Sequence, residues 1–293
     1  MNTAIDCIRA LLNSESMCSV EATKTVKFLA KDYGKLVSAS ALKQFTDYED
    51  DMKHEGLRLS SLGKPAVLQA LELPAVRDEL IECGVYQEEE GASSRLRELF
   101  HRGDQYEALV LFVLQLYGYK VISTQETVSF MGVPGHTDAI IETPFGEQLL
   151  LEVKTMSDYY FKQFVKCQND DRGYITQLAT YAYCTSKTPV WICLNKGNHE
   201  VAVIEPVPEQ LERALTRARV IIPILTDKIS CVDDILANLK APPGVEEVYR
   251  KHKTDKFLLA QSIKYSPYRS MFYELVTEPN GYGKDTEYIL NVI

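Results

Sequence analysis

Residues 135–155, GHTDAIIETPFGEQLLLEVKT, contain the pattern of a β-hairpin. Residues 136–142 are rich in Ile and Thr, and residues 148–154 are rich in Leu and Val, as is typical of strands. Between them, Pro144 presets φ for a turn and Gly146 accepts a positive φ, so Pro144-Phe145-Gly146 favours a tight loop. The sequence therefore predicts two adjacent antiparallel strands in the middle of the chain.

This hairpin would bring three charged side chains together. If the loop has three residues, Thr143 faces Glu147, and Asp138 then falls directly opposite Glu152. Directly opposed residues share one face, with Cβ atoms about 5 Å apart, and Lys154 shares that face because it lies two residues after Glu152. Two carboxylates this close repel each other unless a cation lies between them, and Mg²⁺ would satisfy both. The alternative is a charged pair on the solvent face of an ordinary hairpin.

Length and composition are those of an ordinary globular protein. The 293 residues suffice for one large domain or two small ones, with 45% hydrophobic and 25% charged residues. No apolar run reaches the roughly 18 residues of a membrane span. The first residues show neither a basic region nor a small-residue cleavage site, so we expect no signal peptide and no membrane association.

Cysteine usage and net charge further limit the cellular compartment and the binding partners expected for this protein. The seven cysteines are scattered without a C-x-x-C, which indicates reduced thiols and a cytoplasmic location. The formal net charge of −9 argues against a surface built for non-specific nucleic-acid binding. A local basic groove could still hold DNA.

A long amphipathic helix is predicted over residues 95–117, ended by Gly118. Glu107 falls on its apolar stripe between Gly103 and Val110, and an acid on a buried face needs a partner. Glu107 could pair with a neighbouring Arg or Lys, or it could be the third carboxylate of a metal site. Gly103 would let backbone or substrate approach closely.

Further elements surround the hairpin. Residues 119–129 alternate as a strand, and residues 156–172 are basic with interleaved aromatic side chains, either a nucleic-acid contact or a mobile loop. A helix from about residue 171 to 185 would place Tyr174, Gln177 and Tyr181 on one stripe. A second hairpin over residues 189–204 and a helix over residues 208–219 follow.

Two polar segments are candidates for substrate contact. In Leu59-Ser60-Ser61-Leu62-Gly63-Lys64-Pro65, Ser61 and Lys64 could contact a DNA phosphate, or a serine could cap a turn before Pro65 opens a helix. His136, two residues before Asp138, would share its face and could touch substrate or be a packed strand histidine.

The acidic run at residues 88–91 indicates a boundary. We expect an N-terminal helical region over residues 1–90, a core over residues 91–206, and a C-terminal helical extension over residues 207–293 that packs on the core.

In this order, Glu107, Asp138 and Glu152-Val153-Lys154 resemble the core of PD-(D/E)XK nucleases. Gln177 and Tyr181 resemble the Q-x-x-x-Y motif of the RecB-like branch. The finer pattern is most similar to exonucleases of tailed phages, in Ser60–Pro65, in the spacing of Phe100, Gly103 and Glu107, and in Gly173–Gln177. The resemblance covers about residues 60–205.

The resemblance implies an α/β fold with a restriction-endonuclease-like core, a central mixed β-sheet flanked by helices. It implies a Mg²⁺-dependent deoxyribonuclease, with Mn²⁺ as a substitute, that leaves 5′-phosphates and serves DNA degradation, recombination or repair. The implied metal ligands are Asp138, Glu152, Glu107 directly or through water, and the Val153 carbonyl. Lys154 would position the attacking water, and Gln177 and Tyr181 would orient a phosphate.

Four residues are the expected DNA contacts: Ser61, Lys64, His136 and Tyr174. An exonuclease is favoured over an endonuclease on the same core, and a DNA-binding module with a decayed core is the non-enzyme alternative. Whether the chain forms a homo-oligomer stays open.

Some relatives bind an iron–sulfur cluster through C-terminal cysteines. The matching place here is Lys264–Arg269, which has no cysteine, so we expect no cluster. Tyr265 and Tyr268 would supply hydrophobic packing there.

Overall fold

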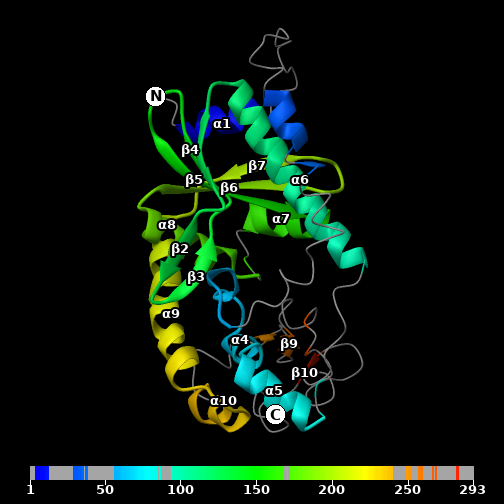
Figure 1. Ribbon diagram of the computed structural model, residues 1–293, viewed down its shortest axis with the longest axis vertical. Helices are drawn as coiled ribbons and strands as arrows, with labels where there is room; N and C mark the ends of the chain where they lie inside the picture. Colours follow the sequence, from blue (N-terminus) through cyan, green and yellow to red (C-terminus); the bar gives the residue numbers. More distant parts are fainter. Residues whose placement is uncertain are drawn as a thin grey trace.

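The computed structural model describes residues 4–12, 29–35, 37–38, 56–84, 86, 94–167, 170, 172–239, 249–251, 257–259, 266, 268 and 282–283 (Figure 1). The predicted boundary at residues 88–91 lies outside this part of the chain. Every helix in the described ranges is either too short or too polar to cross a lipid bilayer.

A five-stranded mixed sheet forms the centre of the molecule. Its order is β1-β4-β5-β6-β7, and all neighbours are antiparallel except β5 and β6, which are parallel. The strands are β1 (Lys120–Thr124), β4 (Ala139–Glu142), β5 (Gln148–Met156), β6 (Thr188–Asn195) and β7 (Val201–Ile204). The predicted α/β class with a central mixed sheet flanked by helices is confirmed, and it is consistent with a restriction-endonuclease-like core.

The predicted hairpin register is confirmed. Ala139 pairs with Leu151 and Glu142 with Gln148, and the main-chain nitrogen of Thr143 donates to the oxygen of Glu147 at 2.8 Å. Gly146 closes the loop with a φ of +83°. One step beyond the Ala139–Leu151 pair, Asp138 and Glu152 are therefore opposite each other.

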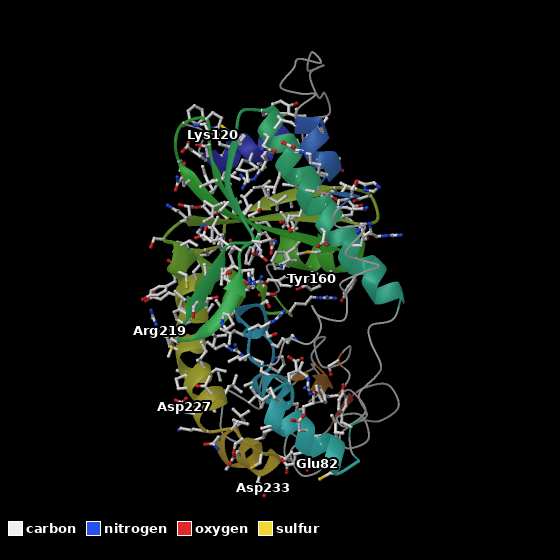
Figure 2. All side chains as sticks on the ribbon, in the orientation of Figure 1. Glu82, Lys120, Tyr160, Arg219, Asp227 and Asp233 are labelled. Atoms are coloured by element: carbon white, nitrogen blue, oxygen red, sulfur yellow. The ribbon has the colours of Figure 1, made fainter. Side chains whose placement is uncertain are left out.

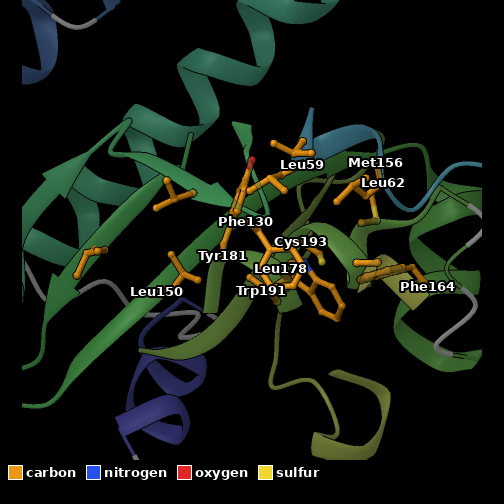
Figure 3. Close-up of a cluster of buried hydrophobic side chains, with 14 of the residues drawn as sticks. Leu59, Leu62, Phe130, Leu150, Met156, Phe164, Leu178, Tyr181, Trp191 and Cys193 are labelled. Carbon is orange, nitrogen blue, oxygen red and sulfur yellow. The ribbon is translucent and has the colours of Figure 1, made fainter. Parts of the chain in front are cut away.

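Helices cover both faces of the sheet because successive strand residues alternate in direction. Leu149 and Leu151 pack toward α1 (Ala4–Leu12) and α6 (Ser94–Leu116). Leu150 faces the other side, where α7 (Asp158–Cys167), α8 (Tyr174–Thr185) and α9 (Pro208–Asp227) enclose a second cluster with Leu178, Tyr181 and Trp191 (Figure 3). The side chains of this second face surround the predicted site.

A third apolar cluster lies at the other end of α9. It joins α9 to α4 (Ala66–Leu71), α5 (Pro74–Glu82) and α10 (Val232–Asn238). Figure 1 shows α9 running from the sheet to this end of the molecule. Tyr268 is buried there against Tyr86, with ring centroids 4.9 Å apart, as predicted for its packing role; Tyr265 lies outside the described residues.

Three short strands complete the described part of the chain, β8 (Tyr249–Lys251), β9 (Phe257–Leu259) and β10 (Tyr282–Gly283). The 3₁₀ turn η1 (Leu59–Ser61) precedes α4 and packs against α8 and β3 (Val133–His136).

Three sequence predictions about elements were wrong. The strand expected over residues 119–129 breaks after Thr124, because Gln125 has a φ of +52°, and the chain then forms a separate two-stranded sheet, β2 (Thr127–Phe130) and β3 (Val133–His136). The mobile-loop alternative for residues 156–172 was wrong, because residues 158–167 form the amphipathic helix α7, whose apolar side buries Phe161 and Phe164; the nucleic-acid contact stays a prediction. The helix predicted over residues 208–219 is α9, which continues to Asp227 despite Pro223, because its further apolar residues are buried.

Candidate active site

Asp138 and Glu152 face each other at the start of β4. The side chain of Glu152 is fully buried, and Asp138 Oδ2 accepts a hydrogen bond of 2.8 Å from the main-chain nitrogen of Val153. This bond ties the loop before β4 to β5, so the two carboxylates are held by the hairpin itself. Burial raises the pKa of both groups, and that of Glu152 reaches about 8 with help from the Asp138 charge.

Lys154 points to the same face as Glu152, as the strand period requires. Its Nζ donates to Glu152 Oε1 at 2.5 Å and lies 5.0 Å from the ring centroid of Tyr174. Burial opposes the charged form of Lys154, but Glu152 and Asp138 outweigh that cost, so the pKa of the ammonium is raised. Lys154 therefore stays charged and compensates one of the two carboxylates.

Glu107 adds a third acid from α6, the helix that covers the opposite face of the sheet. Burial, and after it the Asp138 charge, raises its pKa to about 8, although a 3.4 Å hydrogen bond from Gln125 Nε2 lowers it. Gly103, one turn earlier, has no atom of the described residues within 4 Å of the position that a Cβ would take, so no main chain in that part of the protein approaches it there.

Gln177 and Tyr181 support this group from α8. Gln177 Nε2 donates to Glu152 Oε1 at 2.7 Å and to the Tyr181 hydroxyl at 3.4 Å. The ring of Tyr181 is buried under Gly135, where an added Cβ would come within 2.7 Å of Tyr181 Cε1. The predicted stripe of Tyr174, Gln177 and Tyr181 thus faces Glu152 and Lys154.

The segment after η1 reaches the same end of α8. Gly63 and Gly173 are in main-chain contact, and a Cβ on Gly63 would lie 2.0 Å from the oxygen of Gly173. Gly173 is the N-cap of α8, so this contact places Ser61 and Lys64 beside the helix that carries Gln177.

Lys64 does not face the acids. Its Nζ pairs with both carboxylate oxygens of Glu72, at 3.0 and 3.1 Å, so the structure gives Lys64 a partner within its own region. Its main-chain oxygen accepts a hydrogen bond from Arg217 at 2.9 Å, which fixes the segment to α9. Its predicted role as a DNA contact stays a prediction.

His136 is not on the Asp138 strand, so the prediction that it shares the Asp138 face was wrong. It ends β3, pairs with Thr127, and is exposed, and β4 begins three residues later at Ala139. The physical reason is that Thr137 and Asp138 connect two sheets rather than continue one strand.

The residues present fit a divalent cation through two carboxylates. Glu152 Oε2 is buried and has no hydrogen-bond partner among the described residues. Glu107, Asp138 and Glu152 carry three negative charges against one ammonium, which leaves a formal charge of −2. Mg²⁺ is commonly held by one or two carboxylates together with substrate phosphates and water.

Direct coordination by all three acids is not the arrangement in the structure. Within the described ranges, no three His, Cys, Asp or Glu side chains are placed so that together they could hold a metal ion. Asp138 and Glu152 are the pair that fits, with the neighbouring Val153 carbonyl as a predicted further ligand. Glu107 would act through water.

Several nearby residues escaped the sequence prediction. Asp104, one turn before Glu107, raises the pKa of both Glu107 and Asp138. Lys196 on the β6–β7 turn has its pKa lowered, first by burial and then by the positive charges of Arg172 and Arg102. We call Arg102, Arg172 and Lys196 the basic cluster. These residues are far apart in the sequence, so their proximity could not be predicted from it.

Comparisons with known proteins were made by sequence and by structure. No protein-family model and no curated protein matches the sequence. Similar solved structures include that of SSO0001, with 14% identity, a TM-score of 0.36, and coverage of 66% of this chain and 87% of the other.

An alkaline exonuclease (LHK-Exo) from Laribacter hongkongensis is also similar, with 17% identity, a TM-score of 0.38, and coverage of 59% and 89%. Its complex with dAMP has 17% identity, a TM-score of 0.35, and coverage of 58% and 92%. Similarities this low do not assign a function to this chain.

Proposed function

We propose that this chain is a metal-dependent deoxyribonuclease that degrades DNA from its ends. The observation that carries the proposal is the pair formed by the half-buried Asp138 and the fully buried Glu152, opposed across a hairpin, with Lys154 as the ammonium that contacts Glu152. A purely structural ion pair would need one acid for one base. Here the additional carboxylate and the unpartnered Glu152 Oε2 favour a site that receives a cation.

The chain's own residues would perform distinct tasks. When bound, Mg²⁺ supplies Lewis-acid chemistry, because it lowers the pKa of water and neutralises phosphate charge. Lys154 would hold the attacking water or the phosphate oxygen on the open side of Glu152. Gln177 fixes the Glu152 carboxylate through Oε1, so that Oε2 stays available.

Attack of water on phosphorus, with cleavage of the bond to the 3′ oxygen and transfer of a proton to that oxygen, would leave a 5′-phosphate and a 3′-hydroxyl. Tyr181 holds Gln177 in place through its hydroxyl. Ser61, Tyr174 and the basic cluster lie on the elements around the acids and are the proposed contacts to the DNA backbone.

The test is digestion of end-labelled linear DNA and of covalently closed circular DNA, each with Mg²⁺ and with chelator. We expect Mg²⁺-dependent loss of the linear substrate by the wild type and no loss by Asp138→Asn. Glu142→Gln is the matched control, because Glu142 lies on the same hairpin and pairs with Lys120 at its solvent-exposed end.

Cleavage of the circle would support an endonuclease on the same core. Digestion by Asp138→Asn at the wild-type rate would end the nuclease assignment. Unchanged DNA with both substrates, together with Mn²⁺ binding that does not depend on Asp138, would favour a binding module.

A further inference from the structure

A cavity of about 290 Å³ lies beside the acidic site, between α7, α8, the end of β7 and α9. None of Asp138, Glu152 and Lys154 lines it. The lining side chains are aromatic, cationic and polar: Phe164, Ile175, Thr176, Trp191, Gln210, Arg213 and Arg217, with Asp170, Ile204, Glu205, Pro206 and Ala214. This composition combines apolar ring surface with charged groups.

The apolar wall is made by two aromatic rings. Phe164 and Trp191 meet edge to face, with ring centroids 5.1 Å apart, and Figure 3 shows the two side chains next to each other. Trp191 Nε1 is buried and has no hydrogen-bond partner among the described residues. A buried donor without a partner carries a free-energy cost. Protein atoms enclose this nitrogen, so a ligand would contact Trp191 through its ring.

The charged wall belongs to α9. Arg217 is fixed by hydrogen bonds to the main-chain oxygens of Leu62 and Lys64. Arg213, one turn earlier, is exposed, and its Nε donates to the main-chain oxygen of Glu209 at 3.2 Å. Guanidinium groups bind phosphate through several donors at once.

Two acids, Asp170 and Glu205, also line the cavity, so a phosphate there would depend on Arg213 and Arg217 to offset their charge. Asp170 is engaged at the start of α8, where its carboxylate accepts from the main-chain nitrogens of Arg172 at 3.3 Å and Ile175 at 2.6 Å. Glu205 and Gln210 add one acceptor and one amide, which suit the polar edge of a planar heterocycle.

We propose that this cavity is a second ligand site that binds a nucleobase carrying a phosphate, with the base against Phe164 and Trp191 and the phosphate at Arg213. Phe164 is 3% exposed and Trp191 4%, so the base would touch a small part of each ring, an apolar contact that does not depend on base identity. The site is separate from the acids but adjacent to them, because Trp191 pairs with Glu152 in the β5–β6 register. The ligand would be either a free nucleoside 5′-monophosphate or the end nucleotide of a strand.

The tryptophan offers a direct readout, because Trp191 is the single Trp of the chain. Fluorescence excited at the red edge of tryptophan absorption is followed during titration with thymidine 5′-monophosphate, and separately with a short oligothymidylate, in buffer with chelator. We expect a saturable change that Arg213→Gln weakens at least tenfold. Arg219→Gln is the matched control, because Arg219 lies on the same helix but stacks on Tyr183.

The outcomes separate this proposal from the proposed nuclease. A saturable change that persists in Asp138→Asn and is lost in both Arg213→Gln and Arg213→Glu supports the second site, whether or not the chain cuts DNA. A change with the oligothymidylate alone assigns the site to a strand end. No change with either ligand, a change insensitive to Arg213, or a change lost in Asp138→Asn would overturn it.

Discussion

Lys154 is a buried ammonium whose neighbours carry more negative charge than it can balance. It contacts Glu152 at 2.5 Å, while Asp138 and Glu107 add charge from the hairpin and from α6. Carboxylates in this position must either take up protons or receive a second cation. The protonation of the acids and the occupancy of the site by a cation are therefore coupled.

Replacement of Lys154 by Met keeps the length of the side chain and removes its charge. We expect DNA hydrolysis to fall by about 10²–10⁴-fold, the usual contribution of a positioned proton-transfer or charged group. Lys162→Met is the matched control, because Lys162 pairs with Asp158 on the exposed side of α7. Initial rates on linear DNA at saturating Mg²⁺ measure the effect, and a Lys154→Met rate within about twofold of wild type would contradict the role.

The raised pKa values of Glu107 and Glu152 predict how stability depends on pH. Both rise from 4.5 to about 8, so between these values the folded chain holds protons that the unfolded chain has released. The contribution of these two groups to the free energy of unfolding should then be largest below about pH 4.5 and should fall as pH rises to about 8. The slope is at most about 1.4 kcal/mol per pH unit for each proton.

Urea unfolding of the metal-free protein at several pH values between 5 and 8 measures this slope. We expect Glu152→Gln to remove part of it and saturating Mg²⁺ to flatten it, because the cation stabilises the ionised acids. A wild-type slope identical to that of Glu152→Gln would show that Glu152 is already ionised in the folded chain.

At the scale of elements, two glycines determine how the η1 segment meets α8. A Cβ on Gly63 would lie 2.0 Å from the main-chain oxygen of Gly173, and a Cβ on Gly173 would lie 2.1 Å from the carbonyl carbon of Gly63. Gly173 also has a φ of +79°, which a larger residue adopts at a cost. This close contact places Ser61 near the N-terminal end of α8, where Tyr174 lies.

Gly63→Ala should therefore destabilise the fold by about 1–3 kcal/mol, as overpacking does, and should lower activity more than thermal unfolding alone would explain. Gly103→Ala is the matched control, since a Cβ there meets no atom of the described residues within 4 Å and Ala favours a helix by up to about 1 kcal/mol. Denaturant unfolding compares the two, and equal stability of both variants would mean that the η1 segment can move without loss.

The elements also show how much the sequence could predict. The hairpin, its register, and the stripe of Gln177 and Tyr181 follow from turn chemistry and periodicity, which are local. His136 was misplaced because the end of a strand depends on which sheet the next residues join. Helix α7 was not predicted, because its aromatic residues are compatible with a loop as well as with a helix. The contact of Phe164 with Trp191, which favours the helix, is a tertiary contact that the local sequence does not show.

The whole molecule is acidic, with a formal net charge of −9, so its attraction for DNA must come from local positive charge. The basic cluster takes one residue each from α6, the segment before α8, and the β6–β7 turn. Arg172 also stacks on Tyr160, 4.9 Å from the ring centroid. Figure 2 shows Tyr160 in the middle of the molecule and Lys120 near its far end.

DNA affinity should depend on salt through the basic cluster and not through the total charge. Each phosphate contact that a Lys or Arg makes to duplex DNA steepens the plot of log affinity against log salt by about 0.9. Arg172→Gln and Lys196→Gln should each weaken binding and reduce the slope by about one, whatever the DNA sequence. Lys120→Gln should leave the slope unchanged, because Lys120 already pairs with Glu142 at the sheet edge.

Fluorescence anisotropy of labelled duplex DNA at several salt concentrations gives these slopes. The measurement uses the Asp138→Asn background with chelator, so that the substrate stays intact. If Lys120→Gln lowers the slope as much as Lys196→Gln does, then the DNA contacts are spread over the surface. Arg102 and Arg172 would in that case only lower the pKa of Lys196.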